Sequence, residues 1–149
     1  GCDLATMCDI RIASEEALFA ESFVKLGLIP GDGGAWFLPR AVGVSNANYM
    51  SFTGESIKAD TALQMGLVSE VLAPEKLMAR AMEIAQLIAK NPPHAVRLAK
   101  QLIKGSEKST LDETLDKSAS FQAVCHAEPD HQEAIAAFFE KRDGNYRTR

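Results

Sequence analysis

The strongest structural signal in this chain of 149 residues is a glycine-rich turn, Pro-Gly-Asp-Gly-Gly, at residues 30–34. An apolar segment that includes Phe23 precedes the turn, and a helix is expected to follow over residues 35–42, where Gly43 ends it. Pro39 is expected to bend or shorten that helix. Because glycine-rich backbone lets a ligand approach closely, the turn predicts a place where a helix begins beside a binding site.

The residues before the turn predict a short helix and a strand. Asp3 is a good N-cap for a helix that continues through Met7. Residues 8–13 alternate between apolar and polar side chains, with Ile10 and Ile12 on the same side. This period of two is typical of a strand with one buried face.

The residues after the turn predict mainly helices. Short helices are expected over residues 46–52 and 58–65, with a strand or an extended connection over residues 67–72. From Pro74 the apolar residues recur at helical spacing, over residues 74–90, 94–104, 110–126 and 131–142, and Asp130 is expected to cap the last helix. The order predicts an α/β fold with a core portion at residues 1–72 and an α-helical C-terminal extension at residues 73–149.

Composition excludes several classes of protein. A net charge of −4 gives no electrostatic footprint for nucleic acid, and no apolar run approaches the ~20 residues that span a membrane. The three cysteines (Cys2, Cys8, Cys125) are odd in number and lack a C-x-x-C spacing, and the three histidines show no ligand spacing. We therefore expect no disulfide framework and no metal site, and a reducing compartment.

Five sequence blocks occur in an order that resembles the crotonase (enoyl-CoA hydratase/isomerase) family. They are GCDLATMCDIRIAS, FAESFVKLGLIPGDGGAWFLPRAVG, FTGESIKADTALQMGLVSEVL, NPPHAVRLAK and AIAAFFEKR, and they extend from Gly1 to near Tyr146. The resemblance implies a crotonase-like superhelix of ββα turns, assembled as a homotrimer or hexamer. It also implies an acyl-CoA thioester as substrate, with coenzyme A as part of that substrate and no separate cofactor. The expected location is the cytoplasm, or the mitochondrial matrix in a eukaryote.

The resemblance also suggests that the chain is the C-terminal half of such an enzyme. The chain opens on Gly1 without an initiator Met. In the family, two backbone N–H groups form an oxyanion hole for the thioester enolate, and both would lie before Gly1. We therefore expect the chain by itself to be inactive.

The resemblance places Asp3 and Phe23 where hydratases of the family carry their two catalytic glutamates. Asp3 can be a catalytic acid or base, or only a helix cap. The phenyl ring of Phe23 cannot transfer a proton, so Phe23 is expected in the pocket wall or the core. Asp32 lies one residue after the position of Gly31, where several isomerases and dehalogenases of the family place a working aspartate. Asp32 is therefore the preferred catalytic carboxyl, with a cap as the alternative.

The remaining site candidates line the acyl or the CoA part of the expected pocket. Substrate contacts are expected from Phe23, Glu21, Pro30, Gly31 and Trp36. Glu21 is a weaker alternative carboxyl, which in an extended segment would share a face with Phe23. The resemblance assigns Phe138 and Lys141 to the CoA adenine and phosphates, although an interface aromatic and a solvated lysine would fit as well.

One carboxyl beside an apolar pocket suits proton relocation better than water addition. The sequence therefore favours an isomerase that acts through a thioester enolate. The alternatives are an enoyl-CoA hydratase and a non-catalytic acyl-CoA-binding member of the family.

Overall fold

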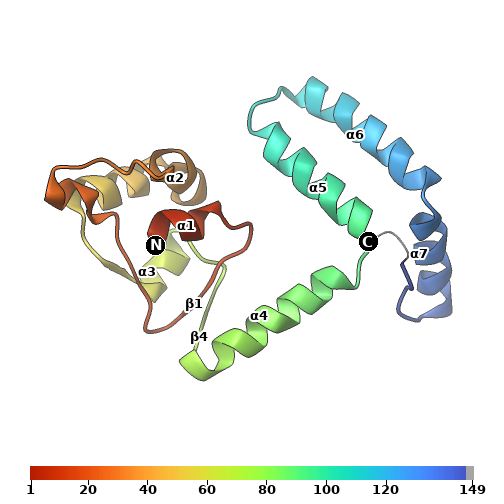
Figure 1. Cartoon of the computed structure of the whole chain (residues 1–149), viewed down its shortest axis with the longest axis horizontal. Helices are drawn as coiled ribbons and strands as arrows, with labels where there is room; N and C mark the ends of the chain where they lie inside the picture. The colour runs from red at the N-terminus through yellow and green to blue at the C-terminus, as the bar shows by residue number, and fades with distance from the viewer. Residues whose placement is uncertain (147–149) are drawn as a thin grey trace. The chain divides into compact units, whose positions relative to one another are not determined.

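The computed structural model describes residues 1–146 of the chain (Figure 1). Contacts between Cα atoms divide it into two units, Gly1–Ala81 and Met82–Arg149, and each is described by itself. Within the described residues, none of the helices combines the length and the apolar character that crossing a membrane requires.

The first unit combines short strands with helices, which confirms the α/β class. Strand β1 (Ile12–Ser14) pairs in parallel with β4 (Glu70–Leu72), and β2 (Leu18–Phe19) pairs antiparallel with β3 (Ile57–Lys58). The helical elements of this unit are α1 (Cys2–Met7), the 3₁₀ helix η1 (Ser22–Leu26), α2 (Gly34–Thr53), α3 (Ala59–Gln64) and the first part of α4 (Pro74–Ala89).

Helix α2 supplies much of the core of the first unit. Its buried side chains include Leu38, Val42 and Met50, which pack with residues of α3 and β1. Gly43 has non-helical backbone angles (φ 77°, ψ 159°) and divides α2 into two segments. These segments correspond to the two helices predicted over residues 35–42 and 46–52. Pro39 lies inside the first segment, and the break comes at Gly43 instead.

The N-terminal prediction is wrong in detail. Gly1 is the N-cap of α1, so Asp3 lies inside the helix, and its side chain is buried rather than capping. The strand begins only at Ile12, and Ile10 is 52% exposed. The first difference arises because tertiary packing turns Asp3 inward, whereas a local pattern places a polar residue at the surface.

The second unit is entirely helical in its described part, as the sequence predicts. Its helices are α5 (Pro93–Ser106), α6 (Leu111–Ala127) and α7 (Pro129–Glu140), after the last turns of α4. Thr110 and Glu113 form a capping box at the start of α6. His94 at the start of α5 contacts Glu128 at 3.0 Å, and Glu128, not Asp130, is the N-cap of α7.

The boundary between the two units falls inside α4. Arg80, in the first half of this helix, forms an ion pair with Glu70 of β4 at 2.8 Å. This contact joins the first turns of α4 to the first unit. The division into a core at residues 1–72 and an extension at residues 73–149 stays a prediction.

Candidate active site

Two carboxyl groups are buried in the first unit. Asp3, from α1, is 4% exposed, and Glu21, which directly precedes η1, is 1% exposed. None of their four carboxyl oxygens has a hydrogen-bond partner among residues 1–146. Burial of an ionised carboxylate without partners is costly, so this arrangement favours a state in which at least one of the two carries a proton.

The neighbouring carboxyl of Asp3 influences the protonation of Glu21. Burial and the neighbouring carboxyl of Asp3 raise the pKa of Glu21 from 4.5 to about 7, and Cys2 opposes this rise only in part. Ionised carboxylates only accept hydrogen bonds, so Asp3 and Glu21 can hydrogen-bond to each other only once one is protonated. The pair is therefore suited to hold and to exchange a proton near neutral pH.

Cys2 lies beside this pair and stays a thiol. Burial, and then the nearby carboxyl of Glu21, raises the pKa of Cys2 from 9.0 to about 12. A thiolate is the nucleophilic form of cysteine, so Cys2 is unsuited to nucleophilic chemistry at neutral pH.

The glycine-rich turn brings the start of α2 to Asp3. Gly33 is the N-cap of α2 and has a positive φ of 99°, which favours glycine. A Cβ atom on Gly34 would lie 2.7 Å from Cγ of Asp3 and closer still to one of its oxygens. The Asp3 carboxyl thus occupies the space of a side chain at position 34. The positive end of α2 favours a negative charge there.

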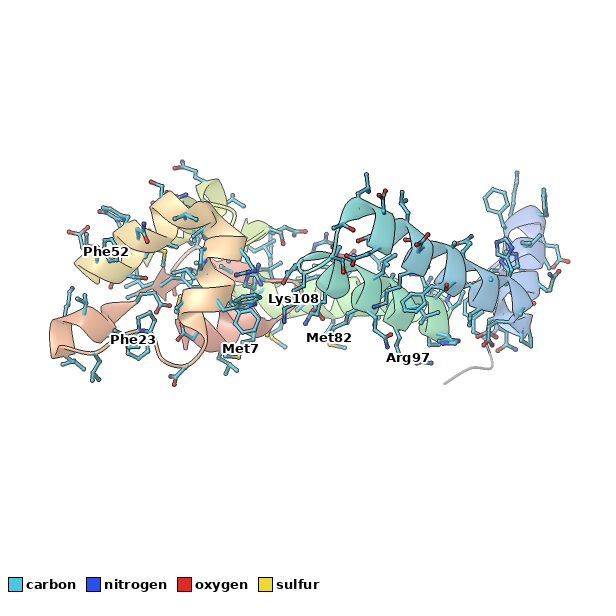
Figure 2. The ribbon with its side chains drawn as sticks, turned by 90° about the horizontal axis from the view of Figure 1, so that it is seen from above. Met7, Phe23, Phe52, Met82, Arg97 and Lys108 are labelled. Atoms are coloured by element: carbon cyan, nitrogen blue, oxygen red, sulfur yellow. The ribbon has the colours of Figure 1, made fainter. Side chains whose placement is uncertain are left out.

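A pocket of about 270 Å³ adjoins the same glycine. One wall comes from η1 and the segment after it, and the other comes from both segments of α2. Phe52, near the end of α2, is one of the wall residues (Figure 2). The lining residues are Val24, Leu28, Ile29, Pro30, Gly34, Ala35, Pro39, Ala47, Asn48, Ser51 and Phe52. Gly34 therefore lies next to the buried Asp3 carboxyl and also lines an apolar pocket, although neither Asp3 nor Glu21 is among the residues that line it.

The structure separates the residues that the sequence proposed as a single site. Pro30 lines the pocket, whereas Asp32 is exposed in the turn. The catalytic role of Asp32 stays a prediction. Trp36 is 41% exposed, with the guanidinium of Arg40 at 3.3 Å from its ring centroid. Phe23 lies in η1, a 3₁₀ helix, so it does not share a strand face with Glu21.

Sequence reasoning ranked Glu21 below Asp32, although Glu21 is the carboxyl that pairs with Asp3. A signal was present, because Glu21 is the sole acidic residue in an otherwise largely apolar segment, residues 17–29. An acidic side chain in an apolar segment usually reaches solvent, and it is rarely fully buried unless it has a partner. The structure shows that it is buried.

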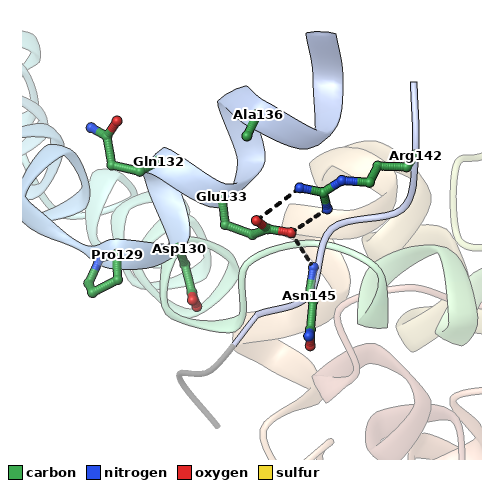
Figure 3. Close-up of a pocket in the computed structure, with 7 residues that line it drawn as sticks. All are labelled: Pro129, Asp130, Gln132, Glu133, Ala136, Arg142 and Asn145. Carbon is green, nitrogen blue, oxygen red and sulfur yellow. Dashed lines mark hydrogen bonds and ion pairs between the residues drawn. The ribbon is translucent and has the colours of Figure 1, made fainter. Parts of the chain in front are cut away.

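The candidates for CoA contact, Phe138 and Lys141, lie in the second unit. Phe138 is 78% exposed, and Lys141 follows α7 in a left-handed conformation (φ 54°). A separate pocket of about 550 Å³ lies beside α7, where the carboxylate of Glu133 contacts Arg142 and the backbone N–H of Asn145 (Figure 3). Glu133 thus neutralises the charge of Arg142, and the CoA contacts stay predictions.

Comparison with known proteins identifies the family. The model of the family described as Enoyl-CoA hydratase/isomerase matches residues 1–149. A short-chain-enoyl-CoA hydratase of Clostridium acetobutylicum is 44% identical over 142 residues, which are 95% of this chain and 54% of that protein. A 1,2-epoxyphenylacetyl-CoA isomerase of Escherichia coli is 36% identical over 146 residues, which are 98% of this chain and 56% of that protein.

Solved structures agree with this assignment. The crystal structure of an enoyl-CoA hydratase from Bacillus anthracis superposes with a TM-score of 0.95 at 38% identity, covering 98% of this chain and 57% of that one. This confirms the predicted crotonase-like fold. The chain spans somewhat more than half the length of these relatives. The chain belongs to the enoyl-CoA hydratase/isomerase family.

Proposed function

We propose that the whole protein adds water to a 2-enoyl-CoA thioester, with Asp3 and Glu21 as its acid–base pair. The buried carboxyl pair beside an apolar pocket carries this proposal. The sequence favoured an isomerase because Phe23 cannot transfer a proton. Glu21, two residues before Phe23, supplies the second carboxyl that hydration requires, so the phenyl ring at position 23 no longer argues against a hydratase. The hydratase names among the relatives favour the same activity.

The pair provides both proton transfers that hydration needs. Asp3, beside the start of α2, takes a proton from water as the water oxygen bonds to C3 of the enoyl group. Glu21, whose pKa of about 7 leaves about half of it protonated at pH 7, gives its proton to C2. The elements of water are thereby added across the double bond. The proton then passes from Asp3 to Glu21, and the pair returns to its starting state.

Isomerisation is a second candidate, because the same pair can take a proton from one carbon and return it to another. The relative named as a 1,2-epoxyphenylacetyl-CoA isomerase supports this alternative. Asp32 remains the carboxyl that the sequence proposes for it. Assembly as a homotrimer or hexamer, and a location in the cytoplasm or the mitochondrial matrix, also stay predictions.

Incubation of the whole protein with a 2-enoyl-CoA and with a 3-enoyl-CoA tests these functions. Hydration increases the mass of the thioester by one water, whereas isomerisation leaves it unchanged, so mass spectrometry separates the two. We expect hydration in the wild type and its loss in Glu21→Gln. Turnover of the 3-enoyl-CoA without hydration would favour the isomerase, and no turnover of either would favour a non-catalytic member.

A further inference from the structure

The side chain of Arg11 holds the C-terminal end of α1. Its Nη1 donates to the carbonyl oxygens of Cys8 at 2.6 Å and of Thr6 at 3.5 Å, and its Nε donates to the carbonyl oxygen of Leu67 at 2.6 Å. The last carbonyls of a helix have no partner within the helix, and a cation suits them because the helix dipole places negative charge there. Arg11 therefore joins the end of α1 to the connection between α3 and β4.

The core side of this contact is well anchored. Leu67 is fully buried, and its backbone N–H donates to the carbonyl oxygen of Ala62 at 2.8 Å. The backbone of Arg11 is also fixed, because its carbonyl oxygen accepts from the backbone N–H and from the hydroxyl of Ser69, each at 2.9 Å. A planar guanidinium donates in fixed directions, so Arg11 sets where the end of α1 lies relative to the core.

Hydrogen bonds continue from Arg11 through Thr6 to Asp3. The buried hydroxyl of Thr6 donates to the carbonyl oxygen of Asp3 at 2.7 Å. Helix α1 has only six residues, and a helix of this length gains little stability from its own hydrogen bonds. Its position therefore depends on contacts with the rest of the unit. A small rotation of α1 would move the Asp3 carboxyl out of the space that Gly34 leaves for it.

We infer that Arg11 is a positioning residue for the acid–base pair: by holding the end of α1, it keeps the Asp3 carboxyl beside Glu21. Arg11 transfers no proton itself, because a guanidinium is not deprotonated in proteins. This inference rests on the proposed function, since that function gives the pair its catalytic role. Loss of the guanidinium should lower kcat more than it changes KM, because it displaces a reacting group and leaves the lining of the apolar pocket in place.

Arg11→Lys and Arg80→Lys form a matched pair of variants. Arg80 also belongs to the first unit and donates two hydrogen bonds, but it donates them to Glu70 of β4 and not to α1. We expect Arg11→Lys to lower kcat of the whole protein about tenfold, with KM changed less than about threefold. Arg80→Lys should keep the wild-type kcat. Thr6→Val removes only the hydroxyl that binds Asp3, and it should also lower kcat.

The pH dependence of stability tests the positioning without requiring turnover. The neighbouring carboxyl of Asp3 contributes to the raised pKa of Glu21, so displacement of Asp3 should bring that pKa back towards 4.5. In urea denaturation, Arg11→Lys and Thr6→Val should then lose less stability between pH 5 and pH 8 than the wild type, and Arg80→Lys should lose as much. Each protein is compared with itself at two pH values, so a general loss of stability cancels.

The two measurements separate the inference from the proposed function. Wild-type pH dependence in both Arg11→Lys and Thr6→Val would overturn the inference, whatever their kcat. An equal loss of kcat in Arg11→Lys and Arg80→Lys would also overturn it, because general destabilisation would then explain both. A weaker pH dependence in Arg11→Lys, in a protein that hydrates no enoyl-CoA, would retain the positioning of the pair and reject the hydratase. If Arg11→Lys does not fold, Thr6→Val decides.

Discussion

The carboxyl group of Asp3 occupies the position that a side chain on Gly34 would need. A Cβ atom on Gly34 would lie 2.7 Å from Cγ of Asp3, and the carboxyl itself is buried without a hydrogen-bond partner among the described residues. Gly34 is the first residue of α2 and also lines the apolar pocket. Glycine at this position therefore lies where three parts of the candidate site come together: the start of α2, the Asp3 carboxyl and the pocket.

Replacement of Gly34 by alanine should displace Asp3 and impair activity. We expect Gly34→Ala to lower kcat about 10²-fold, because misplacement of a catalytic group by an ångström has effects of this size. Overpacking of a buried site should also lower the free energy of unfolding by roughly 1–3 kcal/mol. Steady-state kinetics and urea denaturation of the whole protein measure the two effects.

Gly105→Ala is the matched control for this prediction. Gly105 also lies in a helix, and the nearest atom to an added Cβ is the flexible end of Lys117, at 3.3 Å. Alanine should be neutral there or raise the free energy of unfolding by up to about 1 kcal/mol. If the two variants had the same kinetics and stability, the position of the Asp3 carboxyl would not depend on the absence of a side chain at Gly34.

Local sequence patterns predicted the helices of this chain but not the carboxyl pair. The helices of the second unit follow from the spacing of their apolar residues, as does the break of α2 at Gly43. The pairing of β1 with β4 joins residues 12–14 to residues 70–72, which no local pattern specifies. Asp3 and Glu21 meet for the same reason, through tertiary packing.

Sequence reasoning preferred Asp32 because a glycine-rich turn is a local signal of ligand approach. In the structure the turn approaches Asp3 through Gly34, whereas Asp32 is exposed. Burial of a polar side chain depends on what packs over it. A sequence window that ends at the next turn does not contain that information.

Three isosteric substitutions separate the candidate carboxyls. Glu21→Gln and Asp3→Asn each remove a proton-transferring group and should lower kcat by about 10²–10⁴-fold. Asp32→Asn should lower it less than about threefold, because Asp32 is exposed whereas Asp3 and Glu21 are buried. Steady-state hydration kinetics of the whole protein provides the comparison. A dead Asp32→Asn variant beside an active Glu21→Gln variant would restore the assignment that the sequence favours.

The buried pair should make stability depend on pH. The pKa of Glu21 is about 7 in the folded chain, against 4.5 for an ordinary glutamate. Between these values the folded state binds more protons than the unfolded state, so stability falls as pH rises. The contribution is fully present below pH 4.5 and is lost as pH passes through 7, up to roughly 3 kcal/mol in total.

Urea denaturation of the wild type and Glu21→Gln at pH 5 and pH 8 tests this dependence. Glutamine does not titrate, so the variant should lose less stability than the wild type between these two pH values. The difference between the two proteins removes the contributions of all other titrating groups. An identical loss in both would mean that the pKa of Glu21 is not raised by burial.

Cysteine alkylation provides a chemical test of the surroundings of the pair. The pKa of Cys2 is about 12, so at pH 8 only about one molecule in 10⁴ carries the reactive thiolate there. Cys8 is exposed and serves as an internal reference in the same sample. After brief treatment of the native whole protein with iodoacetamide, peptide mapping should find Cys8 modified and Cys2 intact.

Because Glu21 contributes to the raised pKa of Cys2, Glu21→Gln should speed the modification of Cys2. Burial would still keep that reaction slower than at Cys8. Equal rates at Cys2 and Cys8 in the wild type, or no change at Cys2 in Glu21→Gln, would contradict a buried carboxyl beside this thiol.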